Sequence, residues 1–392
     1  MNAPNARNAR RFDQDALRTW AVVAVMAAGG AAWSLGRLPP RAAAVVEIVR
    51  DDGPNEIDMD EMTQNYYEGL LEMDREPSER GGLATELASW FRAREALPTG
   101  WREQKEPMAF GPDKDFLFRE NIPNFDGVYK GVHVRMNRWG HRSSHDYDQA
   151  KPAGVFRIAM AGGSNTMGFG VKLEDTFAYR LEALLNESHS GAGRPRYEVL
   201  NFSSNGHHLL EKTYVATTRF AAFGPDLAIV DVLASDLGAS DYDFVARRLQ
   251  EGRDLHFDFV REIIEKSDAK PDDSRTRLRQ RLKPYRLTLA DCCLRELKRF
   301  QDSSGIPVVI MALRDDVRGT PAKLQWLARA AEKHGLTVVR IFDSLEGGGQ
   351  DMYVHPRDFH LSGKAQRLVG EELYTKLLQT SSVRALVEGA KD

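Results

Sequence analysis

Residues 155–170, VFRIAMAGGSNTMGFG, contain the change of pattern that decides the fold. The apolar run from Ile158 to Ala161 is typical of a buried strand, and it ends abruptly in Gly162-Gly163-Ser164. An amphipathic pattern begins about ten residues later, so the sequence predicts a strand, a turn that carries Ser164, and a helix. Open α/β sheets bind ligands at such turns. By position alone, Ser164 is a nucleophile, a phosphate ligand or a turn residue.

The alternation of apolar runs and helical patterns continues toward the end of the chain. Apolar residues recur at helical spacing between Phe177 and Leu185 and again over 361–378. Strands that alternate with helices are typical of a parallel sheet that helices cover on both faces. The sequence therefore predicts an α/β fold with a five-stranded parallel sheet. Its predicted strands are 156–161, 197–202, 227–233, 307–313 and 337–342.

Residues 241–290 interrupt this alternation with a charged insertion that is predicted to be helical. Because it follows the third strand, it is expected to be a lid-like or substrate-contacting element. Its basic residues predict a solvated helix face, with a site for an anionic glycan or phospholipid headgroup as the alternative. These residues are Arg275, Arg277, Arg279, Arg281, Lys283 and Arg286.

The beginning of the chain predicts a membrane anchor. Four arginines within residues 1–18 precede an uncharged stretch from Thr19 to Gly36. At 1.5 Å per residue, this stretch just reaches across a bilayer core of roughly 30 Å. The positive-inside rule then predicts a cytoplasmic N-terminus (1–18), a transmembrane helix (19–38) and a remainder on the periplasmic or extracytoplasmic side. A cleaved signal peptide and a buried soluble helix are the alternatives.

Residues 39–150 are predicted to form a juxtamembrane region that ends in a flap. Turn-forming glycines and prolines are frequent from Pro107 to Asp148, and short strands are predicted at 116–118 and 132–136. We expect this flap to pack on the domain that spans 151–392.

Composition excludes several classes of function. The 392 residues carry a net charge of −3, which gives no electrostatic reason to expect a nucleic-acid partner. The two cysteines, Cys292 and Cys293, are adjacent, so the sequence provides neither a disulfide framework nor a cysteine-based zinc site. His207 and His208 are expected to line a pocket or the surface, because carboxylates at metal-ligand spacing are missing. No metal or organic cofactor is predicted.

A histidine and an aspartate near the end of the chain complement Ser164. His360 follows the fifth predicted strand and is expected to open the last helix, which places it on the same sheet edge as Ser164. Asp358, two residues upstream, is close enough to orient the imidazole. The three residues supply a nucleophile, a base and an orienting acid. The alternative for each is a helix-capping or turn role.

Four motifs resemble the conserved blocks of the SGNH/GDSL hydrolase family. Residues 162–166, GGSNT, resemble the first block, Gly-Asp-Ser-x-Thr, and residues 201–206, NFSSNG, resemble the second. Residues 233–236, LASD, occupy the place of the third block, Gly-x-Asn-Asp, and 358–360, DFH, that of the last. The segment 136–142, MNRWGHR, is similar to one that precedes the first block in membrane-anchored members.

The resemblance implies a three-layer, flavodoxin-like domain and a serine esterase. It assigns the catalytic roles to Ser164, Asp358 and His360, and the oxyanion hole to Ser164, Gly206 and Ser235. Two positions depart from the family pattern. Gly163 stands where the family has an aspartate that braces the loop, and Ser235 stands where it has an asparagine that donates to the oxyanion.

The predicted substrate is an acyl ester of the cell envelope, carried by a polysaccharide or a lipid. An O-acyltransferase that uses the same residues on an envelope polysaccharide is one alternative. The other is a catalytically weak scaffold that binds glycans or partner proteins.

Overall fold

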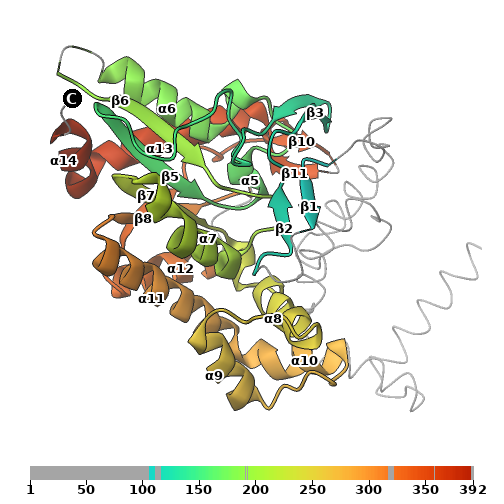
Figure 1. Ribbon diagram of the computed structural model, residues 1–392. Helices are drawn as coiled ribbons and strands as arrows, with labels where there is room; N and C mark the ends of the chain where they lie inside the picture. The colour runs from blue at the N-terminus through green and yellow to red at the C-terminus, as the bar shows by residue number, and fades with distance from the viewer. Residues whose placement is uncertain are drawn as a thin grey trace, which may run out of the picture. The chain divides into compact units, whose positions relative to one another are not determined.

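A parallel sheet of five strands forms the centre of the computed structural model, which describes residues 106–110, 116–189, 191, 193–316, 322–356 and 358–389 (Figure 1). The strand order is β6-β5-β7-β8-β9, so the first strand in sequence lies between the second and the third. This is the flavodoxin-like order. The α/β fold and the five parallel strands predicted from the sequence are confirmed. Their bounds are β5 Val155–Ala161, β6 Arg196–Asn201, β7 Leu227–Val232, β8 Val308–Leu313 and β9 Thr337–Ile341.

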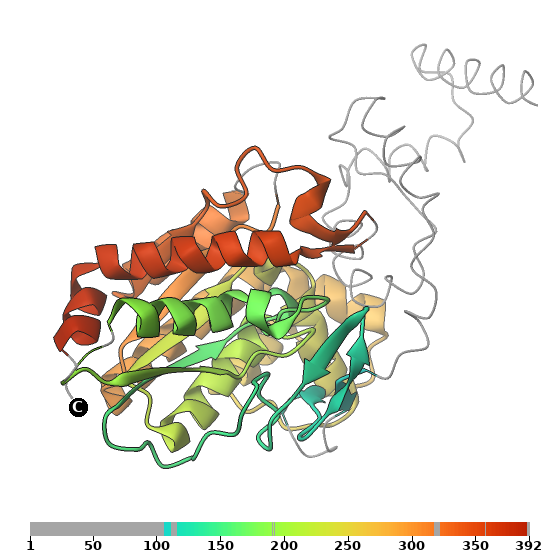
Figure 2. The same ribbon diagram turned by 90° about the horizontal axis from the view of Figure 1, so that it is seen from above.

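Helices cover both faces of the sheet, which makes three layers. Strand β5 illustrates the division, because Ala159 and Ala161 belong to one apolar core and Ile158 and Met160 to the other. On the Ile158 face lie α6 (Phe177–Ser188), α13 (Gly363–Gln379) and α14 (Ser381–Gly389), with α6 and α13 side by side in Figures 1 and 2. On the other face lie α7 (Leu209–Arg219), α11 (Arg286–Ser304) and α12 (Ala322–Lys333).

The insertion after β7 is helical, as predicted. It comprises α8 (Ser240–Gln250), α9 (Asp258–Ser267) and α10 (Arg275–Leu282). Phe244 and Leu278 are buried and extend the apolar core. Within the basic run, Arg275 and Arg279 form ion pairs with Asp243. These arginines are therefore neutralised inside the insertion while their side chains stay partly exposed.

The flap consists of two small antiparallel sheets. Strand β1 (Met108–Phe110) pairs with β2 (Arg119–Asn121), and β3 (Asp126–Tyr129) pairs with β4 (Val132–Arg135). The prediction of a strand at 132–136 is confirmed. The prediction of a strand at 116–118 is wrong, because Phe116 stacks on Tyr214 at 4.6 Å between ring centroids and the segment enters the core.

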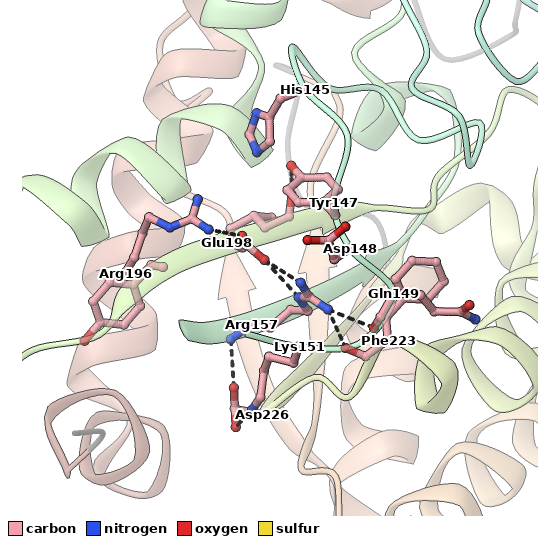
Figure 3. A network of polar contacts seen from close by, with 12 residues as sticks. His145, Tyr147, Asp148, Gln149, Lys151, Arg157, Arg196, Glu198, Phe223 and Asp226 are labelled. Carbon is pink, nitrogen blue, oxygen red and sulfur yellow. Dashed lines mark hydrogen bonds and ion pairs between the residues drawn. The ribbon is translucent and has the colours of Figure 1, made fainter. Parts of the chain in front are cut away.

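Figure 3 shows a buried ion pair between β5 and β6. It lies toward the amino-terminal ends of these strands, whereas Ser164 follows the carboxyl end of β5. Arg157 on β5 is fully buried, and its guanidinium lies 2.8 Å from a carboxylate oxygen of Glu198 on β6. The same guanidinium donates to the carbonyl oxygens of Gln149 at 3.2 Å and Phe223 at 2.8 Å. This pair joins the segment before β5 to the sheet.

The predicted anchor and most of the juxtamembrane region, residues 1–105, lie outside the described residues. Among the helices that the structure does describe, none combines the length and the apolar character that a membrane crossing requires. The transmembrane helix at 19–38 therefore stays a prediction.

Candidate active site

Ser164 is the first residue of a one-turn helix, α5 (Ser164–Met167), that follows β5 directly. Gly162 and Gly163 form the connection, as the sequence predicts, and the side chain of Ser164 is fully buried. The helix ends at Gly168, whose φ of 82° is left-handed and favours glycine. Ser164 therefore lies at the carboxyl end of β5, where open α/β sheets have their sites.

His360 and Asp358 lie on a strand, which corrects the prediction that His360 opens the last helix. Strand β11 (Asp358–Leu361) pairs with β10 (Tyr353–His355), and α13 begins only at Gly363. Because side chains alternate along a strand, Asp358 and His360 share the buried face, while Phe359 between them is 42% exposed. The alternation gives the pair its common orientation.

Asp358 holds one ring nitrogen of His360. Its Oδ1 lies 2.5 Å from His360 Nδ1. Burial alone raises the pKa of Asp358, but the charge and hydrogen bonds of His360, together with the charge of Lys130, outweigh it and lower the pKa. Asp358 is therefore a carboxylate, which only accepts hydrogen bonds, so Nδ1 of His360 is the donor of this bond and Nε2 is the ring nitrogen left for the role of base.

Asn165 joins the turn that carries Ser164 to the strand that carries His360. Its Oδ1 accepts a hydrogen bond from the backbone N–H of Leu361 at 3.0 Å. Its own carbonyl accepts from Nε2 of Gln366 at 2.7 Å. The structure thus brings together the two segments of the predicted nucleophile and base. Sequence reasoning missed Gln366, although a polar residue on the apolar face of the 361–378 pattern was a signal.

The second motif also lies against the Ser164 turn. Gly206 has a φ of 81°, in the turn after β6. Two residues earlier, the N–H of Ser204 donates to the carbonyl of Gly162 at 3.3 Å. His207 and His208 are buried rather than on the surface, and burial lowers their pKa values to about 4 and about 3. The location of Gly206 is compatible with its predicted oxyanion role, which stays a prediction.

Ser235 lies in a short 3₁₀ helix, Ala234–Leu237, and is partly exposed. Its neighbour Asp236 points inward and accepts a hydrogen bond from the N–H of Leu233 at 2.8 Å. The aspartate of the third motif therefore forms a hydrogen bond within its own turn. The oxyanion role of Ser235 stays a prediction.

Asn121 on β2 ties the flap to the second motif. Its Nδ2 donates to the carbonyl oxygens of Ser203 and Gly140, each at 2.9 Å, and its Oδ1 accepts from Ser204 Oγ at 2.9 Å. The flap therefore packs on the domain, as predicted. Sequence reasoning missed Asn121, because a single asparagine in a turn-rich region gives no signal of a partner 82 residues away.

Arg142, the last residue of the MNRWGHR segment, supports the other end of α5. Its guanidinium is buried and donates to the carbonyl of Met167 at 3.1 Å, and also to those of Gly168 and Val171. Burial lowers the pKa of Arg142 to about 10, although the charge of Glu174 acts in the opposite direction. Arg142 thus binds the carbonyl of Met167, the last residue of α5, and two carbonyls of the segment that follows the helix.

Replacing Arg142 by methionine is expected to lower the free energy of unfolding by about 3 kcal/mol, because buried carbonyls lose their donors. Arg135→Met is the matched control. Among the contacts described, this exposed guanidinium donates only to the carbonyl of Ser144, at 2.6 Å. Its replacement is expected to lower the free energy of unfolding by about 0.5 kcal/mol or less. Urea unfolding followed by circular dichroism measures both. Equal losses in the two variants would contradict the assigned support of α5.

Asp241, at the start of α8, provides a pH-dependent prediction. Burial and the charge of Asp236 raise its pKa to about 8, against the N–H of Leu210 and the charge of Lys212. Between about pH 4 and about pH 8, the folded state keeps the proton on Asp241, whereas the unfolded state has lost it. The stabilisation is therefore fully present below pH 4 and is lost as the pH rises through 8.

Asp241→Asn should remove this dependence while an oxygen still accepts from Leu210. Relative to wild type, its free energy of unfolding should rise between pH 4 and pH 8, by at most about 1.4 kcal/mol per pH unit. Urea titrations at pH 5 and pH 8 measure the difference, with Asp258→Asn, whose side chain is 94% exposed, as control. If the difference in free energy of unfolding between Asp241→Asn and wild type is the same at both pH values, the prediction that Asp241 is protonated in the folded state is contradicted.

Comparison with known proteins gives matches among solved structures only. No family model matches the sequence, and no curated protein matches it. The matched structures include a putative lipolytic protein of the G-D-S-L family from Desulfitobacterium hafniense, with 13% identity and a TM-score of 0.33 over 56% of this chain and 98% of that one.

Two esterases are among the other matches. The psychrotrophic esterase EstA from Pseudoalteromonas sp. has 13% identity and a TM-score of 0.36, covering 58% of this chain and 98% of its own. A family 3 carbohydrate esterase from Clostridium thermocellum has 12% identity and a TM-score of 0.36, covering 59% of this chain and 99% of its own. A putative SGNH hydrolase from Slackia heliotrinireducens is also matched, with 14% identity and a TM-score of 0.34.

Proposed function

We propose that the chain is a serine esterase of the SGNH/GDSL type, with Ser164 as nucleophile, His360 as base and Asp358 as the residue that orients the imidazole. One observation carries this proposal: the buried His360–Asp358 pair is tethered to the Ser164 turn by the hydrogen bond between Leu361 and Asn165. A nucleophile, a base and an orienting carboxylate on one sheet edge form the arrangement that acyl transfer requires.

In the proposed reaction, Ser164 Oγ forms a bond to the ester carbonyl carbon while His360 Nε2 takes the hydroxyl proton. The N–H groups of Ser164 and Gly206, with the hydroxyl of Ser235, hold the oxyanion. Collapse of the intermediate breaks the bond to the alcohol, which leaves with the proton from His360. Water then attacks the acyl-enzyme by the same steps, releases the acid and restores Ser164.

Ser164 and His360 are both fully buried, so an ester reaches them only after neighbouring side chains move. The ring of Phe169, for example, stacks on His360 at 4.0 Å between centroids. A small acyl group is therefore the most suitable test substrate. We propose an acyl ester of the cell envelope, on a polysaccharide or lipid, as the natural substrate, with the predicted helix at 19–38 as the membrane anchor.

The same burial favours a second candidate, an O-acyltransferase. When the side chains that move to admit the ester close again around a bound sugar acceptor, bulk water is excluded from the acyl-enzyme, and a sugar hydroxyl takes the acyl group instead. The residues and proton movements are the same, and only the acceptor differs.

Incubation of the full-length chain with p-nitrophenyl acetate, with and without a soluble oligosaccharide acceptor, tests the function. Release of p-nitrophenolate and a transient acetyl adduct on Ser164, found by mass spectrometry, are expected. Acetylated oligosaccharide among the products would identify the transferase. If p-nitrophenolate is not released above the buffer rate and no adduct forms, both enzyme proposals are contradicted. That result would favour the glycan-binding or partner-binding scaffold.

A further inference from the structure

A carboxylate from the neighbouring strand holds the turn that carries Ser164. Asp231 on β7 is fully buried, and its Oδ2 accepts a hydrogen bond from the backbone N–H of Gly163 at 3.2 Å. The same oxygen accepts from the hydroxyl of Thr166 in α5. One carboxylate oxygen therefore binds the residue before Ser164 and the residue two positions after it.

Gly162 makes room for this contact. A Cβ atom at position 162 would overlap with Oδ2 of Asp231 and with the hydroxyl of Thr166. The residue that follows β5 therefore has to be glycine for the Asp231 carboxylate to lie under the turn. This is a local reason for the first glycine of the pair.

Lys212 links this carboxylate to the third motif. Its side chain on α7 is fully buried, with Nζ 2.6 Å from Asp231 Oδ1 and 2.8 Å from Asp236 Oδ2. Burial alone lowers the pKa of Lys212, but the charges and hydrogen bonds of Asp231 and Asp236 outweigh it and raise the pKa. A charged lysine therefore connects the Ser164 turn to the turn that carries Ser235.

We propose that Asp231, Lys212 and Thr166 are positioning residues that set the Ser164 turn relative to the third motif. The inference rests on the proposed function, because positioning matters only if Ser164 reacts. In this inference, Asp231 on β7 braces the loop. The resembled family has its loop-bracing aspartate at the position of Gly163 instead.

Lys212 also lies beside position 163. A Cβ atom there would make an ordinary contact of 4.0 Å with Cε of Lys212, but it would lie only 3.0 Å from the carbonyl oxygen of His207, so that carbonyl would have to shift by a few tenths of an ångström. The φ of Gly163, −88°, is open to any residue. A carboxylate at position 163 would therefore lie beside the same lysine that now pairs with Asp231.

Two substitutions in the full-length chain test the proposal. Lys212→Met removes the cation, and Thr166→Val removes one hydroxyl while it keeps the shape of the side chain. We expect kcat for p-nitrophenyl acetate to fall about 100-fold in Lys212→Met, because small displacements of reacting groups have effects of this size. KM should change less than about threefold, since substrate binding is not the step affected. Thr166→Ser should restore most of the rate lost in Thr166→Val.

Arg157→Met is the matched control, because it also breaks a fully buried ion pair but at the opposite edge of the sheet (Figure 3). It should lower the unfolding midpoint as Lys212→Met does and leave kcat of the folded protein within about threefold. Equal losses of kcat in Arg157→Met and Lys212→Met would overturn the proposal. If Lys212→Met does not fold, Thr166→Val decides: kcat within threefold of wild type overturns it, and a larger loss restored by serine supports it.

Hydrogen exchange separates this inference from the proposed function. Removal of the brace should speed exchange in the peptide that covers residues 162–168, in Thr166→Val and not in Arg157→Met. If exchange is faster in Thr166→Val and the wild-type chain shows no esterase activity, the brace is supported and only the proposed enzyme is contradicted. Unchanged exchange in Thr166→Val would overturn the brace, whether or not the wild-type chain hydrolyses esters.

Discussion

Replacing Ser164 by alanine is expected to lower kcat for p-nitrophenyl acetate by about 10⁵-fold, to the rate that residual binding groups provide. The hydroxyl that would bond to the acyl group is gone, while the turn keeps its glycines and its hydrogen bond to Asp231. Stability should change little, because the substitution removes one oxygen atom from a packed position. Initial rates under substrate saturation measure the effect.

Ser381→Ala is the matched control for this substitution. Ser381 also begins a helix, α14, but it is exposed. Its replacement should leave kcat within about twofold, since surface changes seldom matter. A Ser164→Ala variant that keeps a tenth of the wild-type rate would place the nucleophile elsewhere.

Replacing Asp358 by asparagine is expected to lower kcat by about 10⁴-fold with the fold intact. The carboxylate fixes the proton on Nδ1 of His360 and stabilises the imidazolium that forms during the reaction. An amide in the same place carries no charge and favours the wrong tautomer.

Asp351→Asn is the control for Asp358→Asn. Asp351 precedes the same hairpin, but it is exposed and pairs with Lys364 at 2.5 Å. The kcat of the Asp351→Asn variant should stay within about twofold of wild type. A loss of less than tenfold in Asp358→Asn would show that His360 is oriented by some other group.

The sheet could be predicted because its information is local. Each strand is a short apolar run, and each covering helix repeats apolar residues at helical spacing, so neighbouring residues suffice to identify it. The strand that carries His360 could not be predicted in this way. Its partner, Tyr353–His355, is three residues long, and such a hairpin leaves no periodic pattern in the sequence.

The supports of the site were the least predictable part, because they join distant positions. Arg142 and Met167 are 25 residues apart, and Asn121 and Ser203 are 82 apart. A polar residue in an otherwise apolar run is the only local signal of such contacts. Asp231 within LAIVDV is one example, since a charge in a buried strand requires a partner. The predicted membrane helix at 19–38 lies outside the described residues and stays a prediction.

Covalent labelling of the full-length chain with a p-nitrophenyl alkylphosphonate tests the central proposal most directly. The reagent reacts only with a serine that a base activates, and mass spectrometry locates the adduct. We predict one adduct, on the peptide that contains Ser164, absent in Ser164→Ala and formed far more slowly in His360→Ala. An unmodified chain, or an adduct on another residue that persists in Ser164→Ala, would contradict the proposed nucleophile.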